Sequence, residues 1–200
     1  MEFLDVFKVP KADQVKEEFE IDGDYIYFNI SKQNIEKIFY KVVDILNEPY
    51  LFILECPLKQ DEEEKIRKSN YEPFHKKIYY MGEKDKNFIL NLLKENLANL
   101  LNNGLISYGI ASPTTSEEFM FSKYDVAYFY SKSNEEFVKF LQELGFKQTN
   151  KLTTAWDTFE RNAPGQAYDF TADDEEKNID SFIDKYTKYH GMFLSRIEEN

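Results

Sequence analysis

The sequence has few of the residues from which catalytic and metal sites are usually built. Its 200 residues include two histidines, one cysteine and seven glycines. It contains no glycine-rich phosphate loop and no cluster of histidine and cysteine at the spacing of metal ligands. We therefore predict no metal site, no cofactor and no catalytic residues, and we do not expect an enzyme.

A single cysteine, Cys56, excludes a disulfide within the chain. It ends the apolar run 50–56, which is typical of a buried strand, so we expect a core thiol in reducing surroundings. The first residues show no basic segment followed by an apolar stretch, as a signal peptide would. No apolar run approaches the ~20 residues that a membrane span needs. These absences predict a cytoplasmic protein that does not contact membranes.

Charge of one sign dominates. The chain has 37 acidic and 25 basic residues, a formal net charge of -12. Such a surface repels nucleic acid and anionic lipid and attracts cations. The partner expected from charge alone is therefore a basic protein, and nucleic acid is excluded.

Aromatic residues are abundant by contrast, with 18 Phe and 14 Tyr. Most rings are expected in the core. The surplus can also supply rigid anchors at an interface.

Hydrophobic periodicity predicts the secondary structure. Residues 1–23 are polar and are expected to form a lead-in that ends in a turn at Asp22-Gly23-Asp24. The elements predicted after it are a strand at 25–30, a helix at 35–46, a strand at 50–56, a loop or short helix at 58–74, a strand at 77–81, a helix from 85 to 101, strands at 105–110, 118–121 and 126–130, a helix from 133 to 145, a strand around 152–156, a helix from 171 to 186, and a final segment at 192–197 that is either strand or helix.

Three helix ends have sequence signals. Ser133 with Glu136, and Thr171 with Asp174, have the spacing of capping boxes, in which a hydroxyl and a carboxylate satisfy the first backbone amides of a helix. Gly104 lies where a left-handed residue would end the second long helix.

This order of elements favours an α+β fold: a mostly antiparallel or mixed sheet with helices packed on it, containing β-α-β units. We expect one domain over residues 1–200, a compact unit of two lobes, with residues 1–58 and 75–200 as the candidate sub-lobes.

Acidic residues concentrate in two segments. The first covers residues 17–24, and the second contains Asp173, Asp174, Glu175 and Glu176. One interpretation is a solvated loop followed by a helix start whose acids suit the helix dipole. The other is an electrostatic landing site for a basic protein.

The most distinctive stretch runs from Gly104 to Gly165. It contains the acidic pair Glu117 and Glu118 and the only tryptophan, Trp156, followed by Asp157. Trp156 is either a lid on the sheet or an aromatic anchor for a partner or pocket. The candidate partner-binding residues are therefore Glu117, Glu118, Trp156, Asp157, Asp173, Asp174, Glu175 and Glu176.

The stretch 104–165 looks like a block found in small bacterial proteins. In size, acidity and lack of catalytic motifs, the whole chain is similar to immunity proteins, which protect bacteria from secreted antibacterial toxins. The resemblance implies a cytosolic protein that binds and neutralises a basic, nuclease-like toxin domain. The alternative is a small-molecule-binding module or hydrolytic enzyme with a pocket near Trp156. The sequence does not set the oligomeric state.

Overall fold

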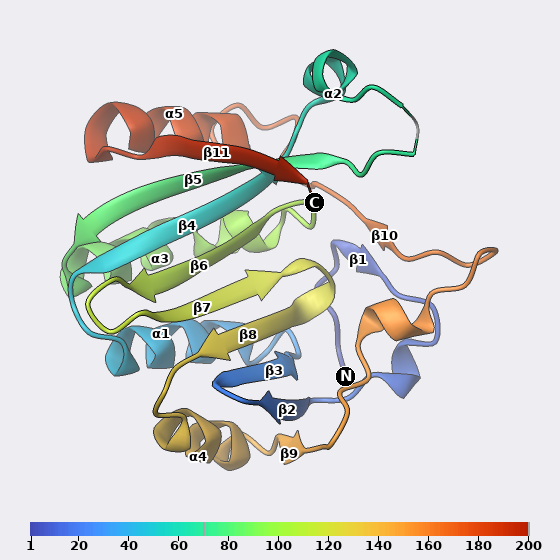
Figure 1. Ribbon diagram of the computed structural model, residues 1–200, viewed down its shortest axis with the longest axis vertical. Coiled ribbons are helices and arrows are strands. Elements are labelled where there is room, and N and C mark those ends of the chain that lie inside the picture. Colours follow the sequence, from blue (N-terminus) through green and yellow to red (C-terminus); the bar gives the residue numbers. More distant parts are fainter. Residues whose placement is uncertain (70, 200) are drawn as a thin grey trace.

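The chain folds around one large β-sheet. The computed structural model describes residues 1–69 and 71–199 (Figure 1). Within these residues, nine strands pair in the order β11-β5-β4-β6-β7-β8-β3-β2-β9, and two more, β1 and β10, form a separate ribbon. Neighbours in the large sheet are antiparallel, except β2 and β9, which are parallel. The predicted α+β fold with a mostly antiparallel, mixed sheet is confirmed.

The centre of the sheet consists of strands that the sequence pattern predicts well. They are β3 (Tyr25–Asn29), β4 (Tyr50–Pro57), β5 (His75–Lys84), β6 (Ser107–Ser112), β7 (Glu117–Ser122) and β8 (Val126–Tyr130). All residues of β6 and most residues of β4 are buried, because side chains cover both faces of these strands. β3 and β4 flank the helix α1 in sequence, yet β8, β7 and β6 lie between them in the sheet.

The edges of the sheet differ in length and exposure. One edge is β11 (Phe193–Glu199), which pairs with β5 and is almost wholly exposed. The other edge consists of β2 (Glu18–Asp22) and the two-residue β9 (Lys147–Gln148). The ribbon of β1 (Phe7–Lys8) and β10 (Gln166–Ala167) lies beyond one end of the central strands (Figure 1).

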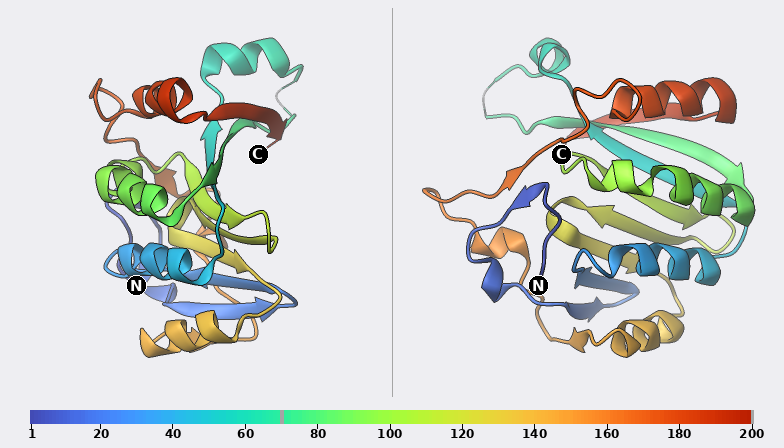
Figure 2. Two further views of the ribbon diagram at one scale, coloured as in Figure 1. Left: turned by 90° about the vertical axis from the view of Figure 1, so that its left-hand side faces the viewer. Right: turned by 180° about the vertical axis from the view of Figure 1, so that it is seen from behind.

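The long helices lie on one side of the sheet. Figure 2 shows α1 (Ile35–Ile45), α3 (Lys86–Leu101) and α5 (Ile179–His190) on this side, with α4 (Glu135–Glu143) beside α1. The short α2 (Gln60–Ile66) lies beyond the ends of β4 and β5. Among the described residues, no helix covers the opposite side, which we call the open face.

The main core lies between the helices and the sheet. Helix α1 buries Ile35, Ile38, Phe39, Val42 and Val43, which recur at helical spacing on one side of it. The facing strands contribute further buried rings, among them Phe28, Phe52, Phe119 and Phe129. Each fully buried Phe stabilises the fold by roughly 1.5–3 kcal/mol relative to an exposed one. Since residues from both 1–58 and 75–200 belong to this cluster, the two ranges share one core.

Three predicted segments have a different structure. Residues 18–22 form the strand β2, not a lead-in, and the turn that follows is the hairpin turn to β3 with Gly23 at φ 61°. Residues around 152–156 form no strand, because Ala155–Thr158 is a short 3-10 helix, η3. Helix α5 begins at Ile179, well after Thr171, and the side chain of Asn178 caps it.

The predicted helix caps are also corrected. Asn134 precedes α4, and the Ser133 hydroxyl bonds to Glu135, not to a backbone amide of the helix. Thr171 bonds to Asp169, which precedes it in the same turn. Gly104 does not end α3 in a left-handed conformation. It is glycine because a β-carbon there would lie 2.9 Å from the Phe7 ring.

The sequence predicts either strand or helix at 192–197, and residues 193–197 of this segment lie in β11. Gly191, with φ 72°, ends α5 in a left-handed conformation.

Candidate functional site

Four tyrosines form a patch on the open face. Successive side chains of a strand point to opposite faces, so Tyr25 and Tyr27 of β3 lie on the open face while Ile26 between them enters the core. On the neighbouring strand β8, Tyr128 and Tyr130 do the same. The ladder pairs Tyr25 with Tyr130 and Tyr27 with Tyr128. We call these four residues the tyrosine surface.

The rings of the tyrosine surface contact one another, some at inclined angles and one pair in parallel. The centroid of Tyr25 lies 4.8 Å from that of Tyr130 and 5.8 Å from that of Tyr128, with interplanar angles of 46° and 64°. Tyr27 is stacked on Tyr25, at 5.6 Å and 9°. Rigid strands and mutual ring contacts hold these side chains in place, so little conformational entropy remains to be lost on binding.

Carboxylates border the tyrosine surface. Glu118 of β7 lies directly opposite Tyr130, and the Tyr128 hydroxyl donates a hydrogen bond to its Oε1. Burial, followed by this hydrogen bond and the charge of Glu118, holds the pKa of Tyr128 well above its ordinary value. On the other side, Asp22 of β2 lies opposite Tyr25.

The pKa of Tyr27 is also raised by negative surroundings. Burial raises its pKa first, and the nearby Tyr25, Asp22 and Glu20 raise it further. Each of these neighbours is neutral or negative, so the potential over the tyrosine surface favours cations.

A cavity of about 360 Å³ opens at the end of the tyrosine surface, where the β6–β7 hairpin approaches β3 and β8. It is lined by Tyr25, Leu51, Ala111, Ser112, Pro113, Ser116, Glu117, Glu118, Tyr128 and Tyr130. The lining combines aromatic and aliphatic carbon with two carboxylates, and it includes no lysine, arginine or histidine.

The other end of the open face has mixed charge. Lys76 Nζ lies 3.0 Å from a Glu55 carboxylate oxygen and 3.4 Å from one of Glu198, whose other oxygen lies 2.7 Å from Arg196 Nε. Lys123 lines the same end, where burial lowers its pKa. Cations and carboxylates neutralise one another here, so the unbalanced negative charge of the open face lies at the tyrosine end.

The sequence-predicted pair Glu117 and Glu118 lies at this tyrosine end, but the two carboxylates have different hydrogen-bond partners. Glu118 faces the tyrosines. Glu117 accepts hydrogen bonds from Ser131 Oγ at 2.6 Å and Thr115 Oγ1 at 2.7 Å, which hold it at the cavity rim.

Trp156 and Asp157 lie elsewhere, in η3. Trp156 is 52% exposed and packs edge-on against Tyr124, with centroids 4.6 Å apart. Tyr124 follows the end of β7 that is remote from Glu118, so at least about 13 Å of strand separates the two regions. Trp156 does not line any of five cavities found among residues 1–69 and 71–199.

Asp157 has a structural role in the same segment. Its Oδ2 accepts hydrogen bonds from the Thr154 backbone N–H at 2.8 Å and from the Thr154 hydroxyl at 2.9 Å. These bonds lower the pKa of Asp157 and cap η3.

The acidic residues Asp173, Asp174, Glu175 and Glu176 lie in the turn before α5, away from both other groups. Asp174 forms an ion pair with Lys177 at 2.6 Å and accepts a hydrogen bond from the Glu176 backbone N–H at 3.1 Å. The structure therefore distributes the sequence-predicted residues over three regions: the cavity at the tyrosine surface, η3 and this turn.

The four tyrosines are not among the site residues that the sequence predicts. A signal was present, because tyrosine recurs at i and i+2 in two predicted strands, residues 25–27 and 128–130. That spacing places each pair on one face. Nothing local indicates that the two strands are neighbours in the sheet, since about a hundred residues separate them.

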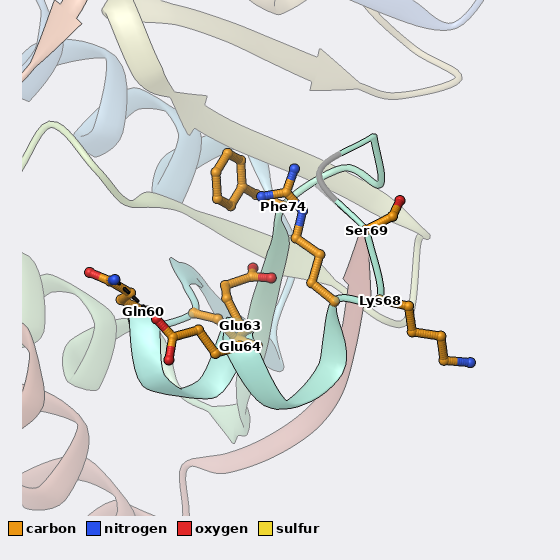
Figure 3. Close-up of a pocket in the computed structure, with 8 residues that line it drawn as sticks. Gln60, Glu63, Glu64, Lys68, Ser69 and Phe74 are labelled. Carbon is orange, nitrogen blue, oxygen red and sulfur yellow. Dashed lines mark hydrogen bonds between the residues drawn. The ribbon is translucent and has the colours of Figure 1, made fainter.

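A larger cavity, of about 690 Å³, lies between α2 and the start of β5 (Figure 3). Its buried acid, Glu63, is used within the fold, because it accepts hydrogen bonds from the His75 backbone N–H at 2.5 Å and lies 3.0 Å from His75 Nδ1. Figure 3 shows Lys68 extending away from Glu63 and Glu64. The polar groups therefore do not converge on a common point, and this cavity is a weaker candidate.

A third cavity, of about 310 Å³, is lined by Cys56 and by the ion-paired Lys59 and Asp180. Burial raises the pKa of the Cys56 thiol to about 12, which makes it a poor nucleophile. In residues 1–69 and 71–199, no three His, Cys, Asp or Glu side chains are placed to hold a metal ion. No helix of this part of the chain is long and apolar enough to cross a membrane.

Comparisons with known proteins identified no relative of this chain. Neither the scan of protein-family models nor the searches of curated proteins and solved structures gave a significant match to this chain.

Proposed function

We propose that this protein binds a basic protein partner through the tyrosine surface and neutralises it. The partner proposed is an antibacterial toxin domain with a nuclease-like cationic cleft, so that the protein acts as a cytoplasmic immunity protein. The observation that carries the proposal is the tyrosine surface itself: four contacting rings, bordered by carboxylates, on a sheet face that no helix of the described residues covers.

Tyrosine is one of the residues that dominate binding energy at protein interfaces, because one rigid side chain combines a large apolar area with a polar tip. Here four such rings occupy adjacent positions on two central strands. A partner that covers them can desolvate a continuous patch without reorganising the sheet.

Charge supports the same choice of partner. The net charge of -12 speeds encounter with a cationic protein. Asp22 and Glu118 lie at the two sides of the tyrosine surface. In the proposed complex, their carboxylates take the place of substrate phosphates in the cationic cleft of the partner. Inhibition by occupation of a cleft requires no turnover, so this function needs no catalytic residues.

The test begins with capture of partners from the organism that makes the protein, at low salt. A captured basic protein is then purified, and its binding to this chain is measured. We expect a 1:1 complex whose association rate falls at least about tenfold between low salt and 0.5 M salt. If the partner is an enzyme, an equimolar amount of this chain should abolish its activity.

A double variant, Tyr25→Ala with Tyr130→Ala, locates the interface. We expect it to weaken binding about 30-fold or more, the loss associated with interface hot spots. The matched control is Tyr189→Ala, which removes an exposed tyrosine from α5 on the opposite side of the sheet. Equal binding by the double variant and the control would show that another surface binds the partner. An association rate that does not change with salt concentration would refute the electrostatic part of the proposal.

The alternative, a small-molecule site near Trp156, stays a separate prediction. It is tested by melting temperature and Trp156 fluorescence across panels of metabolites and metal ions. A shift of several degrees with one small ligand would favour it.

A further inference from the structure

The cavity at the end of the tyrosine surface has a composition that fits one kind of ligand group. We infer that it is a receptor for a single cationic side chain, lysine or arginine. The inference rests on the proposed function for the source of that side chain, which is the basic partner.

Three tyrosines line the cavity from adjacent positions. Because Tyr25 is inclined by 46° to Tyr130 and by 64° to Tyr128, the rings form a corner, not a flat stack. A cation within such a corner lies near several rings at once. The negative faces of aromatic rings attract ammonium and guanidinium groups, and this is how aromatic cages bind cations.

Glu118 supplies the full negative charge. The Tyr128 hydroxyl donates to Oε1 and so orients the carboxylate, while Oε2 accepts no hydrogen bond from any described residue. Glu55, which like Glu118 belongs to a central strand, is already paired with Lys76. Within residues 1–69 and 71–199, no lysine or arginine forms an ion pair with Glu118.

The remaining lining suits the stem of the same side chain. Leu51 and Ala111, from β4 and β6, add aliphatic surface beside the rings. Lysine and arginine bury their methylene groups against such surface while the charged head takes polar partners. The cavity therefore offers apolar contact for the stem and rings with a carboxylate for the head.

The inference can be tested without the partner. The probes are N-acetyl-lysine methylamide and N-acetyl-arginine methylamide, titrated into the full chain and followed by NMR. The control probe is N-acetyl-norleucine methylamide, which keeps the stem of lysine and lacks its charge. We expect saturable shifts at Tyr25, Glu118, Tyr128 and Tyr130 with a cationic probe, and no saturable shift with the norleucine probe.

The variant that tests the charge is Glu118→Gln, which retains an oxygen for the Tyr128 hydroxyl. We expect it to weaken binding of the cationic probe about 2- to 5-fold, the loss associated with a partly exposed ion pair. Glu136→Gln, which makes the same charge change on α4, is the matched control and should bind like the original protein. Melting curves of both variants confirm that they are folded.

The outcomes separate the inference from the proposed function. Equal binding of the lysine and norleucine probes, or no loss in Glu118→Gln, would overturn the inference while a salt-dependent complex with a basic protein could still be observed. Saturable binding of a cationic probe with no basic partner would sustain the cation site and refute the proposed function. A preference between the lysine and arginine probes identifies which side chain the cavity takes.

Discussion

Replacing Asp125 by asparagine is expected to remove a large pH-dependent loss of stability. Asp125 follows β7 in the turn η2 and is wholly buried. Its Oδ2 accepts a hydrogen bond from the Leu4 backbone N–H at 2.7 Å, while Oδ1 has no partner among the described residues. The hydroxyl of Tyr108, which is also fully buried, likewise has no hydrogen-bond partner among the described residues. One hydrogen bond does not offset the cost of burying a carboxylate charge.

Burial raises the pKa of Asp125 from 3.8 to about 8, although the hydrogen bond from Leu4 acts in the opposite direction. The folded protein therefore holds this proton more tightly than the unfolded chain does. The resulting stabilisation is complete below the unfolded pKa near 3.8 and is lost as the pH rises through the folded pKa near 8. At about 1.4 kcal/mol per pKa unit, the loss between pH 4 and pH 8 is about 5 kcal/mol.

The assay is urea unfolding of the original protein and of Asp125→Asn at several pH values from 4 to 8. The unpartnered amide of the variant lowers its free energy of unfolding by about 1–3 kcal/mol, and this loss does not depend on pH. The informative quantity is therefore the difference between the two free energies of unfolding as a function of pH. We expect this difference to shift by about 5 kcal/mol in favour of the variant over the range.

Asp173→Asn provides the control, because it makes the same chemical change in an exposed turn. Its stability should follow that of the original protein at every pH. If the difference between the original protein and Asp125→Asn stays constant from pH 4 to pH 8, the argument from burial is refuted.

Three further predictions concern single positions. Gly109→Ala should destabilise the protein by about 2–3 kcal/mol in urea unfolding, because its β-carbon would lie 2.0 Å from a backbone carbonyl oxygen of the neighbouring strand β7. Gly82→Ala is the matched strand control and should be nearly neutral, since the β-carbon there meets only the end of a flexible leucine side chain at 2.9 Å. Asp157→Ala should cost about 1 kcal/mol through loss of the η3 cap, and an unchanged melting curve would contradict that role. At pH 8, Cys56 should react with a thiol reagent only as fast as the protein opens, because a pKa of about 12 leaves about one thiol in ten thousand ionised; rapid labelling of the folded protein would disprove this.

Local patterns were sufficient for most of the central elements. The strand at 50–56 and the helix at 35–46 have strong periodicity, and β4 and α1 occupy nearly the same residues. The failures fall where the local signal was weak or competed with another. Thr171 and Asp174 have the spacing of a capping box, yet their side chains are taken by Asp169 and Lys177, and Asn178 caps the helix instead.

The candidate site shows the same limit. Glu118 was chosen from its place in a distinctive stretch, but its environment depends on pairing of β7 with β8 and of β8 with β3. The polar residues of β2 predict a lead-in and not a strand. The segment becomes a strand because β3 supplies a hydrogen-bonding edge and Phe19 enters the core.

The amino-acid sequence by itself determined the α+β class, the surplus of negative charge and the alternation that turns each tyrosine pair to one face of its strand. These properties depend on composition and on residues a few positions apart. Only the tertiary structure decided that Tyr130 stands between Tyr25 and Glu118 on neighbouring strands, and that no described helix covers these residues. Strand order and register arise from contacts between distant segments, whose energies no local pattern contains.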